Sequence, residues 1–169
     1  MRMPGLVVPL LVFAAMAAGG CASGGKGEPG REVTSFQSAA EGISTLAGEW
    51  TVFELGERPI AEQLHDSAAR RPSLTIKPDG SVGGFSGVNQ FGSELVTQEL
   101  TRSRFALGPI AMTRMAGPPE LMSIEAKLTM ALSEPRRFML KDNVLSLMPA
   151  EGRADPLVRF QRSAATGSK

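Results

Sequence analysis

Apolar and polar residues alternate in short runs across residues 46–162, and turn-forming residues separate these runs. Alternation with a period of two places every second side chain on one face, which predicts half-buried β-strands. The clearest example is a hairpin in which residues 73–77 and 81–85 are joined through Asp79 and Gly80. Applied along the chain, the same pattern predicts about seven to nine short strands.

One segment has helical rather than strand periodicity. Apolar residues recur at helical intervals between residues 121 and 132, and the preceding Pro118 and Pro119 suit a helix start. Glu125 and Lys127 are expected on the opposite, solvent-facing side. This order of elements predicts an α+β fold, a small antiparallel β-rich domain with one main helix packed on the sheet. The apolar stripe consists of Leu121, Ile124, Leu128 and Leu132.

The amino-terminal residues predict export. Arg2 precedes an uncharged apolar run over residues 6–18, which is shorter than the roughly 20 residues of a membrane-spanning helix and suits a signal peptide at residues 1–20. Small residues then lead to Cys21 in an arrangement that resembles a bacterial lipobox. We therefore expect Cys21 to carry acyl chains such as palmitate. Cleavage after Ala17, which would leave a free thiol, is the alternative.

The remaining segments divide by composition. Residues 21–44 are rich in Gly, Ser and Glu, so we expect the lipidated cysteine and a flexible tether there. A folded domain is expected over residues 45–163, and a disordered tail over residues 164–169. Ala22 follows the cysteine at the position where Asp would favour retention in the inner membrane. We therefore expect an outer-membrane lipoprotein of the cell envelope that faces the periplasm.

Charge and composition exclude several classes of function. The chain has a net charge of +1, and loss of Arg2 with the signal peptide would leave a neutral protein with no electrostatic basis for binding nucleic acid. One cysteine and one histidine, His65, exclude an intrachain disulfide and a Cys-rich zinc site. We expect no metal and no cofactor. The expected partners are the membrane, through the lipid anchor, and an unknown envelope protein.

The segment GGFSGV at residues 83–88 comes nearest to a catalytic motif. A nucleophile elbow around Ser86 needs glycine at position 88, where Val88 stands, and a helix directly after the serine, which the pattern does not predict. We therefore expect no enzyme activity. A serine hydrolase that pairs Ser86 with His65 is the enzymatic alternative.

Four blocks follow one another along the domain: LAGEW at residues 46–50, LTIKPDG at 74–80, GFSGVNQF at 84–91 and IAMTRMAG at 110–117. In this order they resemble the META domain family, which includes HslJ-like lipoproteins. The resemblance implies a small envelope domain linked to stress response, without a settled molecular activity. Its motif residues, which form either structural corners or the lining of a binding groove, are Trp50, Asp79, Gly80, Ser86, Gly87, Asn89, Thr113 and Met115.

Two positions depart from the family pattern. Val88 and Gly117 stand where the resemblance implies a pair of cysteines, so we expect Val88 to pack against the start of the helix, near Gly117. The sequence as a whole predicts a non-enzymatic accessory or binding protein of the envelope. A periplasmic inhibitor or chaperone-like binding module is the alternative.

Overall fold

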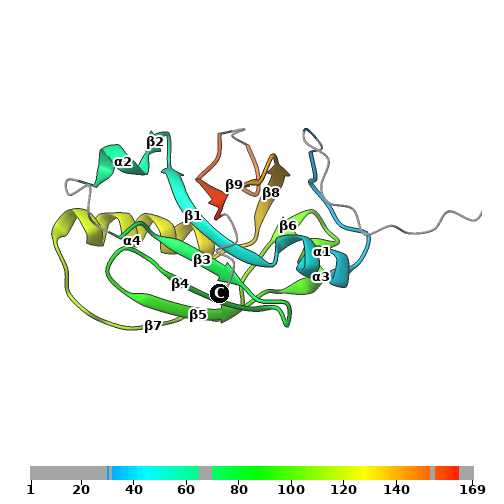
Figure 1. The fold of residues 1–169 in the computed structure, drawn as a ribbon, viewed down its shortest axis with the longest axis horizontal. Helices are drawn as coiled ribbons and strands as arrows, with labels where there is room; N and C mark the ends of the chain where they lie inside the picture. Colours follow the sequence, from blue (N-terminus) through cyan, green and yellow to red (C-terminus); the bar gives the residue numbers. More distant parts are fainter. Residues whose placement is uncertain (1–29, 31, 65–69, 153–154, 164–169) are drawn as a thin grey trace, which may run out of the picture.

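The described residues form ten strands, against the seven to nine predicted from the alternating pattern, and these strands pair antiparallel throughout (Figure 1). The computed structural model describes residues 30, 32–64, 70–152 and 155–163. The predicted signal peptide, Cys21, His65 and the predicted tail lie outside these residues. In the ranges that are described, no helix is both long enough and apolar enough to cross a membrane.

The strands form one sheet in the order β6-β8-β9-β10-β1-β3-β4-β5-β7, with β2 paired to β1 off this path. Just beyond β6, Leu107 forms a bridge with Leu95, which follows β5, so the two ends of the sheet approach each other and the sheet curls around its core. The strands are β1 (Gly48–Leu55), β2 (Arg58–Pro59), β3 (Ser73–Ile76), β4 (Ser81–Phe85), β5 (Gln90–Glu94), β6 (Arg104–Phe105), β7 (Ala111–Met112), β8 (Arg136–Lys141), β9 (Val144–Met148) and β10 (Val158–Arg162). The helices are α1 (Ala39–Leu46), α2 (Ile60–Gln63), α3 (Thr97–Leu100) and α4 (Pro119–Leu132).

The core lies between the inner face of the sheet and α4. Trp50 and Phe160 contribute fully buried rings from neighbouring strands, and Leu128 and Leu132 contribute the apolar stripe of α4. Full burial of a large apolar side chain contributes about 1.5–3 kcal/mol, so this layer is the main source of stability. The α+β prediction is confirmed, with α4 as the main helix.

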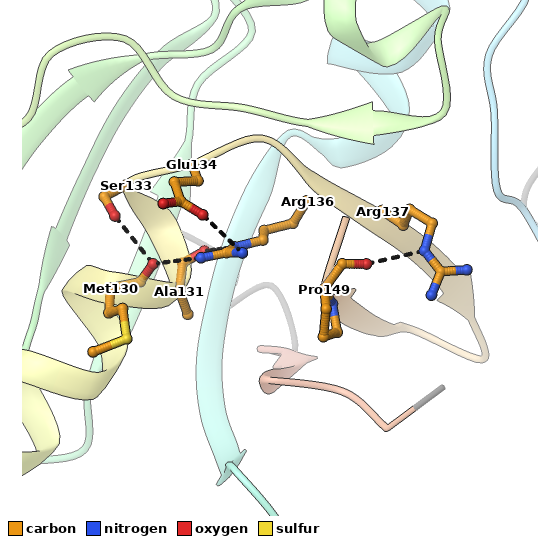
Figure 2. A network of polar contacts seen from close by, with 7 residues as sticks. All are labelled: Met130, Ala131, Ser133, Glu134, Arg136, Arg137 and Pro149. Atoms are coloured by element: carbon orange, nitrogen blue, oxygen red, sulfur yellow. Dashed lines mark hydrogen bonds and ion pairs between the residues drawn. The ribbon is translucent and has the colours of Figure 1, made fainter. Parts of the chain in front are cut away.

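The carboxyl end of α4 is held by an arginine from the next strand (Figure 2). Arg136, which is 9% exposed, donates from Nε to the carbonyl oxygen of Ala131 at 3.2 Å and from Nη2 to that of Met130 at 2.9 Å. Its Nη1 also lies 3.1 Å from a carboxylate oxygen of Glu134. A guanidinium at this position satisfies carbonyls that the helix leaves open and complements the negative end of its dipole.

The predicted tether is ordered over its last part, which corrects the expectation for residues 21–44. Val33 exchanges two backbone hydrogen bonds of 2.8 Å with Leu140, and the ring of Phe36 stacks on Phe138 with centroids 5.3 Å apart. Helix α1 then begins after Ser38, whose Oγ accepts a 3.1 Å bond from the amide of Glu41. The segment folds because Phe36 has a place in the core, although its overall composition resembles a linker.

Arg162 fixes the end of α1 to the sheet. Its guanidinium lies 4.2 Å from the ring centroid of Trp50 and donates to the carbonyl oxygens of Thr45, at 2.5 Å, and Ala47, at 2.6 Å. Burial lowers the pKa of Arg162 below its ordinary value, because the charged form loses solvation. The arginine therefore closes one end of the core and caps a helix at the same time.

Candidate functional site

The predicted motif residues of the third and fourth blocks meet beside α4. Ser86 and Asn89 lie in the turn between β4 and β5, whereas Thr113 and Met115 lie directly after β7. Gly87 allows α4 to approach this turn, because its φ is +132° and a Cβ there would lie 3.1 Å from the carbonyl oxygen of Leu121. The turn and the helix are therefore in backbone contact.

Glu125 of α4 is the centre of this cluster, and the sequence analysis placed it wrongly. The residue was expected in solvent but is only 7% exposed. Its Oε2 lies 2.5 Å from Ser86 Oγ and accepts a 2.8 Å bond from the amide nitrogen of Asn89. Its Oε1 accepts a 2.8 Å bond from Asn89 Nδ2. Three donors around a buried carboxylate explain why it tolerates removal from water.

The protonation of Glu125 follows from these contacts. Burial by itself raises the pKa of a carboxyl group, because the charged form is desolvated. The hydrogen bonds from Ser86 and Asn89 stabilise the charged form and outweigh burial, so the pKa of Glu125 lies below its ordinary value of 4.5. The carboxylate is therefore ionised at neutral pH and serves as an acceptor for the turn.

The side chain of Asn89 uses all four of its hydrogen-bonding positions. Nδ2 donates to Glu125 and, at 3.1 Å, to the carbonyl oxygen of Met115. Oδ1 accepts from the amide nitrogen of Met115 at 2.7 Å and from Thr113 Oγ1 at 2.9 Å. Rotating the side-chain amide by 180° would turn Nδ2 toward the donors of Thr113 and Met115 and turn Oδ1 toward the Glu125 carboxylate. The network therefore fixes the orientation of the amide. Asn89, which is 2% exposed, thereby ties the segment after β7 to α4.

Ser86 is enclosed in the same network. Its side chain is 1% exposed, and Oγ lies within 2.8 Å of the carbonyl oxygen of Asn89 as well as close to Glu125. A nucleophile must reach a substrate carbonyl, and this hydroxyl faces a carboxylate and a carbonyl inside the fold. In the part of the chain that is described, no group of three His, Cys, Asp or Glu side chains could hold a metal ion.

The other predicted motif residues lie elsewhere and shape the fold. Trp50 is buried, and its Nε1 donates a 2.9 Å bond to the carbonyl oxygen of Leu46. Asp79 accepts from both the amide nitrogen and the Oγ of Ser81, at 2.9 and 2.7 Å, and these bonds lower the pKa of its carboxyl group. Gly80 has a φ of +85°, as the turn requires.

Val88 and Gly117 are in contact, as the sequence analysis expected. A Cβ placed on Gly117 would lie 2.6 Å from Val88 Cγ2 and 3.4 Å from Val88 Cβ. Cysteine pairs in disulfides have Cβ atoms about 3.5–4.5 Å apart, so the two positions have nearly the spacing that a cross-link needs. In this chain the valine side chain occupies the space above the glycine.

The family model described as the META domain matches residues 44–164. The chain belongs to the META domain family. All four blocks that carried the resemblance lie within the matched residues, and two of them build the network around Asn89 and Glu125.

Solved structures support the fold of this META domain. An NMR structure of a protein from Burkholderia xenovorans is similar over 88% of this chain and 99% of its own, with 20% identity and a TM-score of 0.55. A second NMR structure is similar over 71% of this chain and 93% of its own, again with 20% identity, and has a TM-score of 0.53. At this identity the similarity shows the fold alone. No curated protein matches the chain.

An open depression lies apart from the Asn89 network, on the outer side of β1 and β10. It has a volume of about 380 Å³. The guanidinium of Arg162 is directed to Trp50 and the end of α1. Arg71 is therefore the lining residue whose charge faces the depression. The lining residues are Thr51, Phe53, Arg71, Gln161, Arg162 and Ser163.

Proposed function

We propose that this protein is a lipid-anchored lipoprotein of the outer membrane whose META domain acts in the periplasm as a non-enzymatic binding module. Cys21 is the acylation site in this proposal, because the only cysteine of the chain follows a short apolar run and a series of small residues. Two or three acyl chains anchor a protein firmly, whereas a single chain binds only marginally.

The binding role rests on one observation, which is the complete internal pairing of the Asn89 side chain. Its two donors and two acceptors bond to Glu125, Thr113 and Met115. A catalytic centre presents polar groups to a substrate, whereas the polar groups of Asn89 hold the segment after β7 against α4. The segment that they hold, residues 113–116, is exposed. The network thus stabilises a display surface.

Lipidation is tested by mass spectrometry of the protein purified from bacterial membranes. We expect a mature chain that begins at Cys21 with a mass increase from diacylglycerol, and a Cys21→Ser variant that keeps its signal peptide and gains no lipid. A Ser23→Ala variant is the matched control and should be lipidated normally. A mature chain that begins at Ala18 and carries no lipid would contradict the proposal.

The absence of hydrolase activity is tested with a fluorophosphonate probe that labels activated serines. We expect no labelling of the purified full chain, because Ser86 Oγ is buried against Glu125. Labelling that disappears in a Ser86→Ala variant with a native circular dichroism spectrum would establish the enzymatic alternative instead.

A further inference from the structure

The segment between β7 and α4 has an unusual combination of exposure and restraint. Residues 113–118 contain no helix, strand, turn or bend, and residues 113–116 are exposed. In Figure 1 this connection runs along the outer left edge of the molecule before it enters α4. Connections of this kind are commonly mobile, but here the buried Asn89 holds the segment at two points.

The two restrained positions flank Arg114. Thr113 is held through its Oγ1, which bonds to Asn89 Oδ1 and accepts a 3.1 Å bond from the amide of Gln90. Met115 is held through both its backbone nitrogen and its backbone oxygen. Arg114 therefore lies between two residues that are fixed to one buried amide, while its own side chain is exposed.

The backbone of Arg114 and Ala116 remains available to a partner. In an extended chain the N–H and C=O groups of successive residues point to opposite sides. Those of Met115 point to Asn89, so in an extended segment those of its two neighbours face the opposite side. Within the described residues, the backbone groups of Arg114 and Ala116 have no hydrogen-bond partner, and no carboxylate pairs with the Arg114 guanidinium.

We propose that residues 113–116 form a substrate-like inhibitory loop, in which Arg114 enters the acidic specificity pocket of a serine peptidase that cleaves after basic residues. Such peptidases bind an extended segment through backbone hydrogen bonds of alternate residues, together with one side chain in a pocket. Arg114 and Ala116 supply the alternate backbone groups, and the exposed guanidinium supplies the charge that complements the pocket. This inference rests on the proposed binding role and specifies its partner.

Restraint by Asn89 gives the loop its affinity and its resistance to cleavage. A flexible segment loses conformational entropy when it enters a cleft, whereas a segment already fixed on both sides of Arg114 loses little. The same contacts hold Thr113 and Met115 in place on the two sides of the Arg114–Met115 bond, which opposes the separation that hydrolysis requires. The buried carboxylate of Glu125 supports this arrangement by orienting the Asn89 amide.

The test measures inhibition of trypsin, the probe peptidase, by the purified full chain kept in detergent. Hydrolysis of a small chromogenic substrate reports the trypsin activity. We expect competitive inhibition that Arg114→Ala weakens by about 100-fold, as for a central interface residue, and that Arg114→Lys largely retains. Arg104→Ala, which removes another exposed arginine, is the matched control and should inhibit as the unmodified chain does. Arg114→Leu should transfer inhibition from trypsin to chymotrypsin.

The role of the restraint is tested with Thr113→Val, which removes one of the two anchoring contacts and keeps a side chain of similar size. We expect faster cleavage between Arg114 and Met115, visible as two fragments by mass spectrometry, while circular dichroism shows an intact fold. Absence of trypsin inhibition, undiminished inhibition by Arg114→Ala, or rapid cleavage of the unmodified chain at this bond would each overturn the inference. Lipidation of Cys21 and fluorophosphonate labelling are measured separately, so the proposed function can stand or fail independently.

Discussion

Asn89 and Glu125 are 36 residues apart in the sequence and joined by two hydrogen bonds of 2.8 Å, from N to Oε2 and from Nδ2 to Oε1. Both partners are buried, and the acceptor is charged, so each bond belongs to the stronger class of protein hydrogen bonds. Through this pair, α4 holds the turn after β4 and, beyond it, the segment after β7. The stability of the domain and the display of residues 113–116 therefore depend on the same carboxylate.

Replacing Glu125 by alanine should destabilise the domain by about 3 kcal/mol. The change leaves the backbone N–H of Asn89 and one N–H of its Nδ2 without an acceptor in a buried site, whereas Ser86 Oγ keeps the carbonyl oxygen of Asn89. Each unsatisfied group costs roughly 1–3 kcal/mol, part of which water entry recovers. Glu125→Gln should cost less, because it keeps one acceptor oxygen. Urea unfolding followed by circular dichroism measures both, and Ser123→Ala on the exposed side of α4 serves as control. Equal stability of the Glu125→Ala variant and the unmodified chain would show that the network contributes nothing.

The ionisation of Glu125 should make stability depend on pH in the acidic range. The folded-state pKa lies below the ordinary value of 4.5, so the stabilisation is fully present above that value and is lost as the pH falls through the folded-state pKa. Asp79 is shifted in the same direction. We expect the free energy of unfolding to fall as the pH drops below about 4.5, and to fall less in Glu125→Gln. Because Asp79 is present in both proteins, the difference between the two curves isolates Glu125.

Local sequence pattern was sufficient to predict most of the sheet and its main helix. The strands over residues 73–76 and 81–85 alternate cleanly and are joined by Asp79 and Gly80, so their hairpin is specified within a dozen residues. The apolar stripe of α4 likewise determines which face meets the core. The contact of Val88 with Gly117 was predictable because two departures from one family pattern occurred together.

Elements whose partners are distant in sequence were not predictable in the same way. Phe36 stacks on Phe138, about a hundred residues later, and helix α1 contacts α3, so the contacts that order this segment are not local. The local signal for the helix was Ser38 three residues before Glu41, a spacing typical of a helix start. Glu125 lies four residues after Leu121 and three before Leu128, which places it on the apolar stripe, and this spacing was the available signal for its burial. A carboxylate on that stripe requires buried donors, and the donors come from the turn between β4 and β5.

Arg136 should stabilise the domain by capping the carboxyl end of α4. We expect Arg136→Ala to destabilise the domain by about 2 kcal/mol, because the carbonyl oxygens of Met130 and Ala131 lose a charged donor at a largely buried helix end. Arg136→Lys should recover only part of this, since one ammonium cannot reproduce the two-nitrogen contact. Thermal unfolding with Arg104→Ala as control measures the effect. A melting temperature of the alanine variant equal to that of the control would exclude a capping role.

A disulfide between positions 88 and 117 should form when both residues are changed to cysteine. The Cβ atoms would lie 3.4 Å apart, slightly closer than the usual range, so a small shift of the turn is sufficient. The bridge would close a loop of about 30 residues and should stabilise the domain by roughly 3 kcal/mol in oxidising buffer, with the gain lost on reduction. Because Cys21 is also present, the change is made together with Cys21→Ser, and free thiols are counted with a maleimide reagent. The single variant Gly117→Ala should instead destabilise, because its methyl group would lie 2.6 Å from Val88 Cγ2. Two reactive thiols that persist under oxidising conditions would show that the turn after β4 and the start of α4 are not held at the distance seen here.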